Sequence, residues 1–248
     1  KNFIALALSI NLEKNYAVHL GINVKDFENY GVKFFNTASE VIHKSDLILK
    51  VNCPNDENIK ELKETQIIVG SGLMAEQLTE DVAVRLIANT IATGAGLFVL
   101  ITVFADISGA HFNPFVSIAM TYTGNLKSKL LPIYITAQIL GCLLGVGLAN
   151  FFFEHEIYEL SSKSRDGIYI FVSEIVATLG LILIIFGSMK SGKITVAASV
   201  GLYITAGYWF TSSTSFANPA VAIARTFTES FTGINYLNTP FYIIAELI

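Results

Sequence analysis

The sequence has few of the residues that would indicate a disulfide-bonded, metal-binding or nucleic-acid-binding protein. Only two cysteines occur, Cys53 and Cys142. The second lies in an apolar run, so we expect neither a disulfide between them nor a metal site. Basic runs are absent and the net charge is −4, which argues against nucleic acid as a partner. The chain starts at Lys1 and shows no signal peptide.

Charged residues are scarce after Gly70. Residues 1–70 hold 17 of the 36 Asp, Glu, Lys and Arg residues, and the other 178 residues hold 19. The break in composition predicts two domains, 1–69 and 70–248. A hydrophobic fraction of 52% and a mean hydropathy of +0.56 are high for a soluble protein and indicate a membrane protein.

Four apolar runs have the length of about 20 residues that a membrane-spanning helix needs. Buried helices of a large soluble protein are the alternative, but too little polar chain remains to cover them. Residues 240–248 are typical of the opening of a further helix. The predicted spans are Val82–Phe104, Leu130–Phe153, Ile168–Met189 and Ile194–Phe210.

The loop charges predict how the spans cross the membrane. Lys127 and Lys129 precede the second span, and Lys190 and Lys193 connect the third to the fourth. Lysines in short loops favour the cytoplasmic side, which leaves the mostly acidic segment 154–166 outside. We expect a multi-pass protein of the cell (inner) membrane with the lipid bilayer as a partner.

Two short apolar segments do not span, and both contain an Asn-Pro pair. Asn113-Pro114-Phe115 and Asn218-Pro219-Ala220 each continue as Asn-Pro-x-Val-x-Ile-Ala, 105 residues apart. One segment follows a span that runs inward and the other follows a span that runs outward. Such an inverted repeat of short, Pro-interrupted segments is typical of a transport path.

The residue types in these segments favour half-helices that meet in the membrane. Asn is a good N-cap and Pro is favoured at the first helical position. Each helix N-terminus carries roughly +0.5 charge, so a facing pair repels cations. The amides of Asn113 and Asn218 can then donate to a passing neutral molecule, and the extended residues 109–111 and 215–217 can present carbonyls to it.

Ser108-Gly-Ala-His111-Phe-Asn-Pro and Ser215-Phe-Ala-Asn-Pro-Ala resemble the two signature loops of the aquaporin (major intrinsic protein) family, and the resemblance covers about residues 67–248. It implies a mainly α, inverted-repeat helical bundle with two half-helices. The implied function is a passive channel for water or small neutral solutes, not an enzyme, assembled as a homotetramer. The resemblance also implies that His111 supports the pore and that Glu174 braces the second loop.

Several positions depart from the family pattern. Val221 stands where most aquaporins have the filter arginine, and Thr93 and Tyr208 align with other filter positions. Resemblance to bacterial members with such filters implies solutes larger than water, such as glycerol or trivalent arsenic hydroxide. We interpret Arg225 as an interfacial anchor, and Phe115, in place of the usual Ala, predicts a narrowing beside the pore centre.

The first 69 residues have the pattern of a small α/β fragment. The stretches Tyr30–Phe35 and Ser45–Pro54 resemble the N-terminal domain of the NAD(P) transhydrogenase α subunit and of alanine dehydrogenases. An alternative function is therefore a component of a proton-translocating transhydrogenase, although it leaves the duplicated Asn-Pro segments without a role. The pattern predicts strands at Val32–Phe35, Asp46–Val51 and Gln66–Val69, and helices at Ala38–Lys44 and Asp56–Lys63.

Two nucleotide-like motifs lack the context that they need, so we predict no cofactor. Gly70-Ser-Gly72-Leu-Met-Ala75 fits GxGxxA but is followed by a span and not by a βαβ unit. Gly187–Lys193 fits GxxxxGK, but Ile194 replaces the Ser or Thr. The remaining polar candidates, which we interpret as surface residues, are Lys14, His19 and His43.

Only the segment 67–74 aligns with the first aquaporin helix, and its eight residues would cover roughly 12 Å of about 30 Å. With a start at Lys1 and an unfinished last helix, this leads us to expect a joining of two gene fragments that conducts poorly on its own. Genomic DNA that reads through the codon for Gly70 in one continuous frame in independent samples would contradict the joining.

Overall fold

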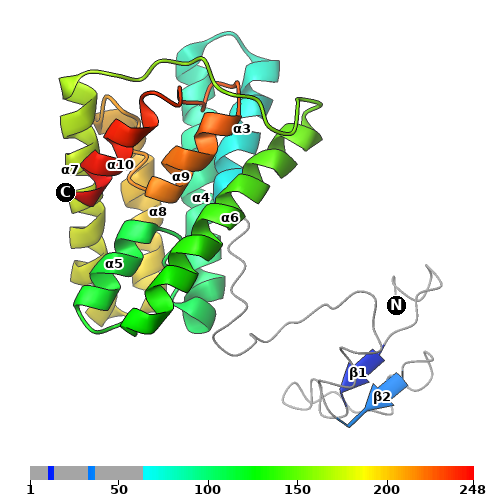
Figure 1. Ribbon diagram of the computed structural model, residues 1–248, viewed down its shortest axis with the longest axis vertical. Helices are drawn as coiled ribbons and strands as arrows, with labels where there is room; N and C mark the ends of the chain where they lie inside the picture. Colours follow the sequence, from blue (N-terminus) through cyan, green and yellow to red (C-terminus); the bar gives the residue numbers. More distant parts are fainter. Residues whose placement is uncertain (1–10, 14–32, 37–63) are drawn as a thin grey trace. The chain divides into compact units, whose positions relative to one another are not determined.

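The computed structural model describes residues 11–13, 33–36 and 64–248 (Figure 1). The chain divides into two compact units, Lys1–Asn52 and Cys53–Ile248. In the first unit, β1 (Asn11–Glu13) and β2 (Lys33–Phe35) pair in parallel, and β2 falls within the strand predicted from Val32. The following predictions lie outside the described residues: Asp46–Val51, Ala38–Lys44, Asp56–Lys63, Lys14, His19, His43 and Cys53.

The second unit is a helical bundle, as a mainly α membrane protein requires (Figure 1). Its helices are α3 (Glu64–Leu78), α4 (Val82–Ser108), α5 (Pro114–Tyr122), α6 (Leu131–Phe152), α7 (Ile168–Ser188), α8 (Lys193–Phe210), α9 (Pro219–Ala224) and α10 (Thr239–Leu247). Short 3-10 turns occupy Ser128–Leu130, Met189–Ser191 and Arg225–Phe227.

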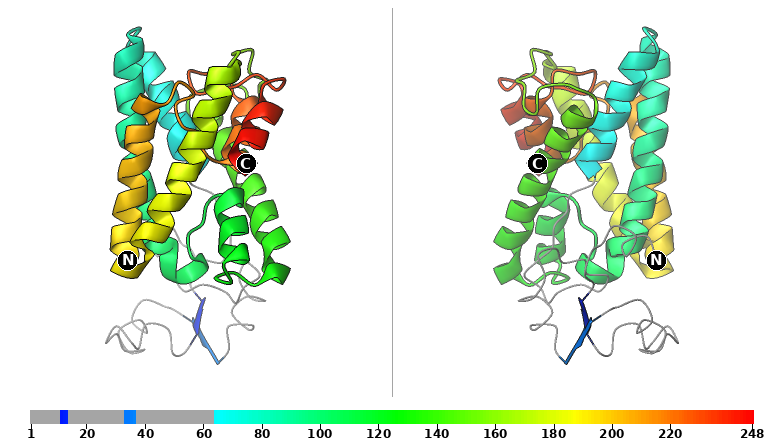
Figure 2. Two further views of the ribbon diagram at one scale, coloured as in Figure 1. Left: turned by 90° about the vertical axis from the view of Figure 1, so that its left-hand side faces the viewer. Right: turned by 90° about the vertical axis from the view of Figure 1, so that its right-hand side faces the viewer.

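Among the residues described, three helical segments are long and apolar enough to cross a membrane: Val82–Ser108, Ser128–Phe152 and Ile168–Ser191. They coincide with the first three predicted spans. The fourth predicted span is the helix α8, whose 18 residues include more hydroxyl side chains than the others. It lies along α4, so its polar positions can face protein and not lipid (Figure 2).

The strand predicted over Gln66–Val69 is wrong, because these residues belong to α3. Ile68, Val69 and Leu73 are all at most 4% exposed, and this spacing places them on one side of a helix that packs against α4 and α6. A short apolar run cannot distinguish a strand from a buried helix by itself. The helix has 15 residues and covers roughly 22 Å, and Gly70 lies inside it.

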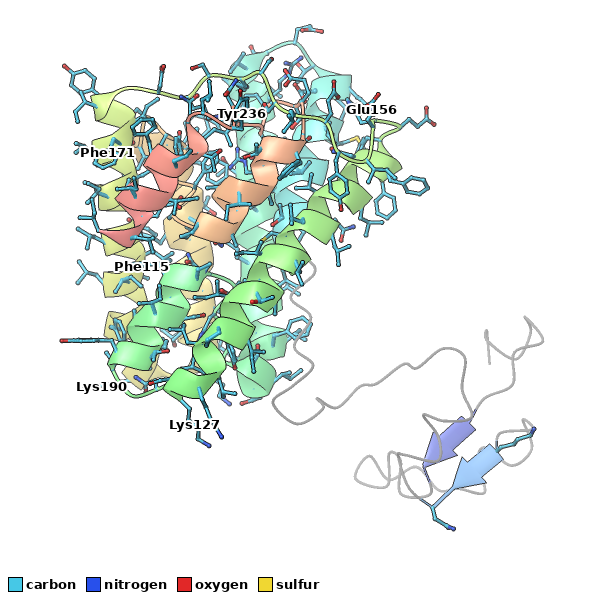
Figure 3. The ribbon with its side chains drawn as sticks, viewed as in Figure 1. Phe115, Lys127, Glu156, Phe171, Lys190 and Tyr236 are labelled. Atoms are coloured by element: carbon cyan, nitrogen blue, oxygen red, sulfur yellow. The ribbon has the colours of Figure 1, made fainter. Side chains whose placement is uncertain are left out.

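The loop lysines lie together at one end of the bundle. Figure 3 shows Lys127 and Lys190 at this end, and Glu156 and Tyr236 at the other. The arrangement agrees with the distribution of charge that the loops predicted. We call the lysine end the inner end and the opposite end the outer end.

Helices α4 and α8 approach closely where two glycines face each other. A Cβ on Gly201 would lie 2.7 Å from the carbonyl oxygen of Gly94, and a Cβ on Gly94 would lie 3.0 Å from the carbonyl oxygen of Gly201. Small residues at helix interfaces allow such an approach in lipid. Because backbone atoms block both positions, a side chain there requires the helices to separate.

We therefore expect Gly201→Ala to destabilise the bundle by about 1–3 kcal/mol. Thermal unfolding in detergent measures the effect. Gly187→Ala in α7 is the matched control, because its Cβ would meet nothing within 4 Å. Equal melting temperatures for the two variants would contradict the close approach.

Candidate pore

Each half-helix begins at the asparagine of its signature tripeptide. Asn113 and Asn218 have extended backbones, with φ of −153° and −155°, and Pro follows each at the start of the helix. Oδ1 of Asn113 accepts from the N–H groups of Phe115 and Val116 at 2.9 and 3.4 Å. Oδ1 of Asn218 accepts in the same way from the second and third residues after it, at 3.1 and 3.5 Å. These caps fix the first residue of each half-helix. Both half-helices begin in the middle of the bundle (Figure 1).

The two tripeptides are joined by a reciprocal pair of hydrogen bonds. Nδ2 of Asn113 donates to the carbonyl of Ala217 at 2.6 Å, and Nδ2 of Asn218 donates to the carbonyl of Phe112 at 2.8 Å. Helix α5 runs from this junction toward the inner end and α9 toward the outer end (Figure 1). Each asparagine thus caps its own helix and holds the loop of the other repeat.

The backbone before each asparagine follows the same strained path. Ala110 and Phe112 have φ of 49° and 50°, and Ser215 and Ala217 have φ of 50° and 48°. These are the third and first positions before Asn113 and Asn218. Left-handed conformations are uncommon for residues other than glycine and persist only where the surroundings hold them. The segments expected to be extended therefore contain left-handed residues at the fourth, third and first positions before each asparagine.

Glu174 binds the backbone of the second signature loop. Its Oε1 accepts from the N–H of Phe216 at 2.9 Å and its Oε2 from the N–H of Ala217 at 2.8 Å. The side chain is completely buried. A carboxyl group that accepts two hydrogen bonds can stabilise a loop that contains three left-handed residues, Thr214, Ser215 and Ala217.

The first signature loop is held by neutral groups. Nδ1 of His111 lies 3.1 Å from Oγ of Ser117, and Nε2 of Gln138 donates to the same oxygen at 2.9 Å. The hydroxyl of Tyr134 donates to the carbonyl of Ser108 at 2.9 Å. His111 therefore belongs to a network with α5 and α6.

The sequence interpretation missed Tyr134 and Gln138, and it also missed Glu246 in α10, whose Oε1 accepts from the N–H of Asn218 at 3.1 Å. A signal for them exists. Residues 132–138 and 240–246 share the pattern Pro-x-Tyr-Ile-x-Ala-Gln/Glu. This second duplication extends the inverted repeat to α6 and α10, the helices that follow the two signature loops.

A cavity of about 210 Å³ extends from the signature loops toward the inner end. Asn113, Asn218 and His111 line it at the signature loops, and Lys193 lines the inner mouth, where its ammonium pairs with Asp106. Apolar side chains from α4, α7 and α8 form much of the remaining wall. Phe115 does not line this cavity, so the narrowing expected from its side chain does not occur there.

The expected filter residues lie on the outer side of this cavity. Thr93 and Tyr208 are 2% and 4% exposed, and their hydroxyls are 3.4 Å apart. Each lies one helical turn from a residue of the cavity wall, Leu97 and Ile204 respectively. The structure brings these two together. Val221, in contrast, is buried in an apolar cluster with residues of α3 and α6.

The interpretation of Arg225 as an interfacial anchor is wrong, because its side chain is only 2% exposed. Nε donates to the carbonyl of Thr232, and the guanidinium carbon lies 3.6 Å from the centroid of the Phe216 ring. The loop after α9 folds over it. Arg165, from the loop between α6 and α7, lies 5.4 Å from the same ring. Two guanidinium groups thus flank the second signature loop.

The outer loops are tied to each other. Nζ of Lys163 donates to the carbonyl of Phe231 at 2.8 Å, and burial, helped by nearby Arg165, lowers the pKa of Lys163 to about 8. Burial alone would raise the pKa of Glu229, but the backbone and hydroxyl hydrogen bonds from Ser162 hold that pKa below its ordinary value. These contacts fasten the segment that covers Arg225.

The two nucleotide-like motifs lie in places unsuited to phosphate. Gly70–Ala75 is the interior of α3, and Gly187–Lys193 is the turn between α7 and α8. Within residues 11–13, 33–36 and 64–248, no group of three or more His, Cys, Asp or Glu side chains could hold a metal ion.

Comparisons with known proteins agree with this geometry. The family model described as major intrinsic protein matches residues 65–248. The model described as alanine dehydrogenase/PNT, N-terminal domain, matches residues 1–96, which overlaps α3 and the first part of α4.

Among curated proteins, the aquaglyceroporin AqpS of Rhizobium meliloti (strain 1021) is 48% identical over 181 residues, which are 73% of this chain and 78% of that protein. A probable TIP-type aquaporin of Medicago truncatula is 33% identical over 166 residues, 62% of this chain and 66% of that protein. Among solved structures, the aquaglyceroporin from Plasmodium falciparum has the same fold, with a TM-score of 0.56 and 24% identity over 78% of this chain and 89% of that one.

The duplicated half-helices, the family model over most of the chain and these relatives lead to the same assignment. The chain belongs to the major intrinsic protein family of membrane channels.

Proposed function

We propose that the chain passes water and small neutral solutes as large as glycerol, with trivalent arsenic hydroxide as a further candidate. The observation that carries the proposal is the pair of facing half-helices joined through Asn113 and Asn218 at the end of a largely apolar cavity. A path lined both by polar groups and by apolar side chains suits solutes that have hydroxyl groups and a hydrocarbon part. The relative from Rhizobium meliloti is described as an aquaglyceroporin.

Charge selection follows from the same geometry. Two helix N-termini meet at the centre, and each carries roughly half a positive charge. The buried guanidinium group of Arg225 and the half-buried one of Arg165 add positive charge on the outer side. Cations therefore meet an unfavourable potential with little water to screen it, and neutral solutes do not.

Thr93 and Tyr208 are the proposed outer filter, and Val221, which packs against α3 and α6, stands at the position of the family's filter arginine. None carries charge, and the arginine that would narrow an aquaporin filter is absent from position 221. The Thr93 and Tyr208 hydroxyls can bind a solute hydroxyl, since each is both a donor and an acceptor. A wider, uncharged opening favours glycerol relative to a strict water filter.

Liposomes that contain the full chain test the proposal by stopped-flow light scattering after an osmotic step. We expect water and glycerol permeabilities above those of empty liposomes, with potassium excluded. Permeabilities equal to those of empty liposomes would contradict the function. That this chain conducts poorly stays a prediction. A comparison of its permeability per channel with that of the relative from Rhizobium meliloti tests it.

Residues 1–96 match a dehydrogenase-related N-terminal domain, which is the feature that the alternative, a transhydrogenase component, would explain. We propose instead that residues 1–69 form a fragment without nucleotide-binding activity, joined to the channel domain 70–248. Calorimetric titration with NAD distinguishes the two. We expect no binding, and micromolar affinity would favour the alternative.

An arginine introduced at position 221 tests whether this position belongs to the filter of Thr93 and Tyr208. We expect Val221→Arg to lower glycerol permeability about tenfold more than water permeability, since a steric change of this size discriminates by about 1–3 kcal/mol. Val221→Leu adds volume without charge and is the control. An unchanged glycerol-to-water ratio in a monodisperse Val221→Arg protein would contradict the filter assignment.

We also propose a homotetramer in the inner membrane, by analogy with the family. Light scattering of the detergent-solubilised protein after size exclusion should give four times the mass of the chain. A monomeric mass in several mild detergents would argue against the tetramer.

A further inference from the structure

The backbone of the second signature loop is held by two carboxylates, although the sequence predicted one. The N–H groups of Phe216 and Ala217 donate to Glu174, and the next N–H, that of Asn218, donates to Oε1 of Glu246. Both carboxylates are completely buried. Three consecutive N–H groups therefore bind two acidic side chains from different helices, α7 and α10.

Glu246 occupies the position in the second repeat that Gln138 occupies in the first. Both follow the pattern Pro-x-Tyr-Ile-x-Ala. Gln138 donates to the hydroxyl of Ser117, inside the half-helix α5, whereas Glu246 accepts from the backbone of the signature asparagine itself. The equivalent residue thus binds a side-chain hydroxyl in the first repeat and a backbone N–H in the second.

The chemistry of the two side chains explains the difference. A glutamine offers donors and one acceptor, whereas a carboxyl group offers two oxygens and can accept a hydrogen bond in either protonation state. The carboxyl group of Glu246 therefore accepts from the N–H of the cap residue Asn218 at 3.1 Å. The other oxygen, Oε2 of Glu246, lies in the same buried site, with the carboxyl group of Glu174 as its neighbour.

We propose that Glu246 is a positioning residue of the pore, which fixes Asn218 and through it the selectivity for larger solutes. The proposal rests on the proposed function. Among the contacts of Asn218, its N–H donates to Glu246, its Oδ1 accepts from the first turn of α9, and its Nδ2 donates to the carbonyl of Phe112. Loss of the first allows the asparagine to rotate, and that movement displaces the carbonyl of Phe112 at the cavity.

A large solute is more sensitive than water to such a displacement, because it must contact several fixed groups at the same time. The expected signature is therefore a changed ratio of glycerol to water permeability and not a uniform loss. The conservative variant Glu246→Gln keeps an acceptor for the N–H of Asn218 and should rescue the ratio. Glu246→Leu removes the acceptor.

The test measures both permeabilities of the full chain in liposomes for the wild type, Glu246→Leu and Glu246→Gln. We expect Glu246→Leu to lower glycerol permeability about tenfold relative to water, and Glu246→Gln to stay within about twofold of the wild type. An unchanged ratio in Glu246→Leu, or an equal loss for both solutes in both variants, would overturn the proposal.

Hydrogen exchange read by mass spectrometry provides a second measurement that does not depend on transport. The peptide that contains residues 211–222 should exchange faster in Glu246→Leu and at the wild-type rate in Glu246→Gln. Gln138→Leu is the matched control, and it should leave exchange of this peptide unchanged. If the wild type conducts nothing, the proposed function fails and the exchange result still decides the role of Glu246: equal exchange in Glu246→Leu and the wild type would refute it.

Discussion

Asn218→Asp is expected to lose most of its permeability to water and glycerol while it keeps the half-helix α9. Aspartate caps a helix as well as asparagine does, and its charge suits a helix N-terminus. It cannot donate, however, so a carboxylate oxygen would face the carbonyl of Phe112 where Nδ2 now donates at 2.8 Å. The two loops would separate at the centre of the pore.

The loss of a buried hydrogen bond of this kind costs about 1–3 kcal/mol, which corresponds to about tenfold or more in permeability. Stopped-flow measurements on liposomes with matched protein content give the value. Asn125→Asp is the control, because Asn125 lies in an exposed turn at the inner end, where its amide donates to Thr123. Wild-type permeability in Asn218→Asp would show that the link between the loops is dispensable.

Glu174→Leu is expected to cause the largest loss of stability. Its removal leaves the N–H groups of Phe216 and Ala217 buried without an acceptor. Each unsatisfied group costs about 1–3 kcal/mol, so the total is about 2–6 kcal/mol and the melting temperature falls by about 5 °C or more. Glu174→Gln retains one acceptor but turns an amide toward the N–H of Ala217, so its loss should be intermediate.

Fluorescence-detected melting in detergent, followed by permeability of the proteins that remain folded, separates stability from transport. Glu156→Leu in the exposed outer loop serves as the control for loss of a glutamate. A melting temperature within about 1 °C of the wild type for Glu174→Leu would mean that other donors and acceptors hold the loop.

Much of the fold was predictable from local pattern. The long apolar runs and the lysines of the inner loops predicted the spans and their alternation, because a bilayer demands about 20 apolar residues. The strand predicted at Gln66–Val69 was wrong. So short a segment fits the periodicity of a strand or of a helix, and the helix is the form that packs against α4 and α6. Arg225 was misplaced for a similar reason. A lone charge near a predicted membrane boundary is usually exposed, but here the loop after α9 covers it.

The sequence by itself determined the duplicated Asn-Pro half-helices, since capping and the fixed φ of proline act within four residues. It also determined the channel family that these half-helices indicate. Only the tertiary structure decided what holds them. Three sets of contacts join residues that are far apart in the chain. They are the reciprocal bonds of Asn113 and Asn218, the bonds from three consecutive N–H groups to Glu174 and Glu246, and the packing of Val221 against α3 and α6. Hydrogen bonds and buried contacts depend on distance in space, which no local pattern specifies.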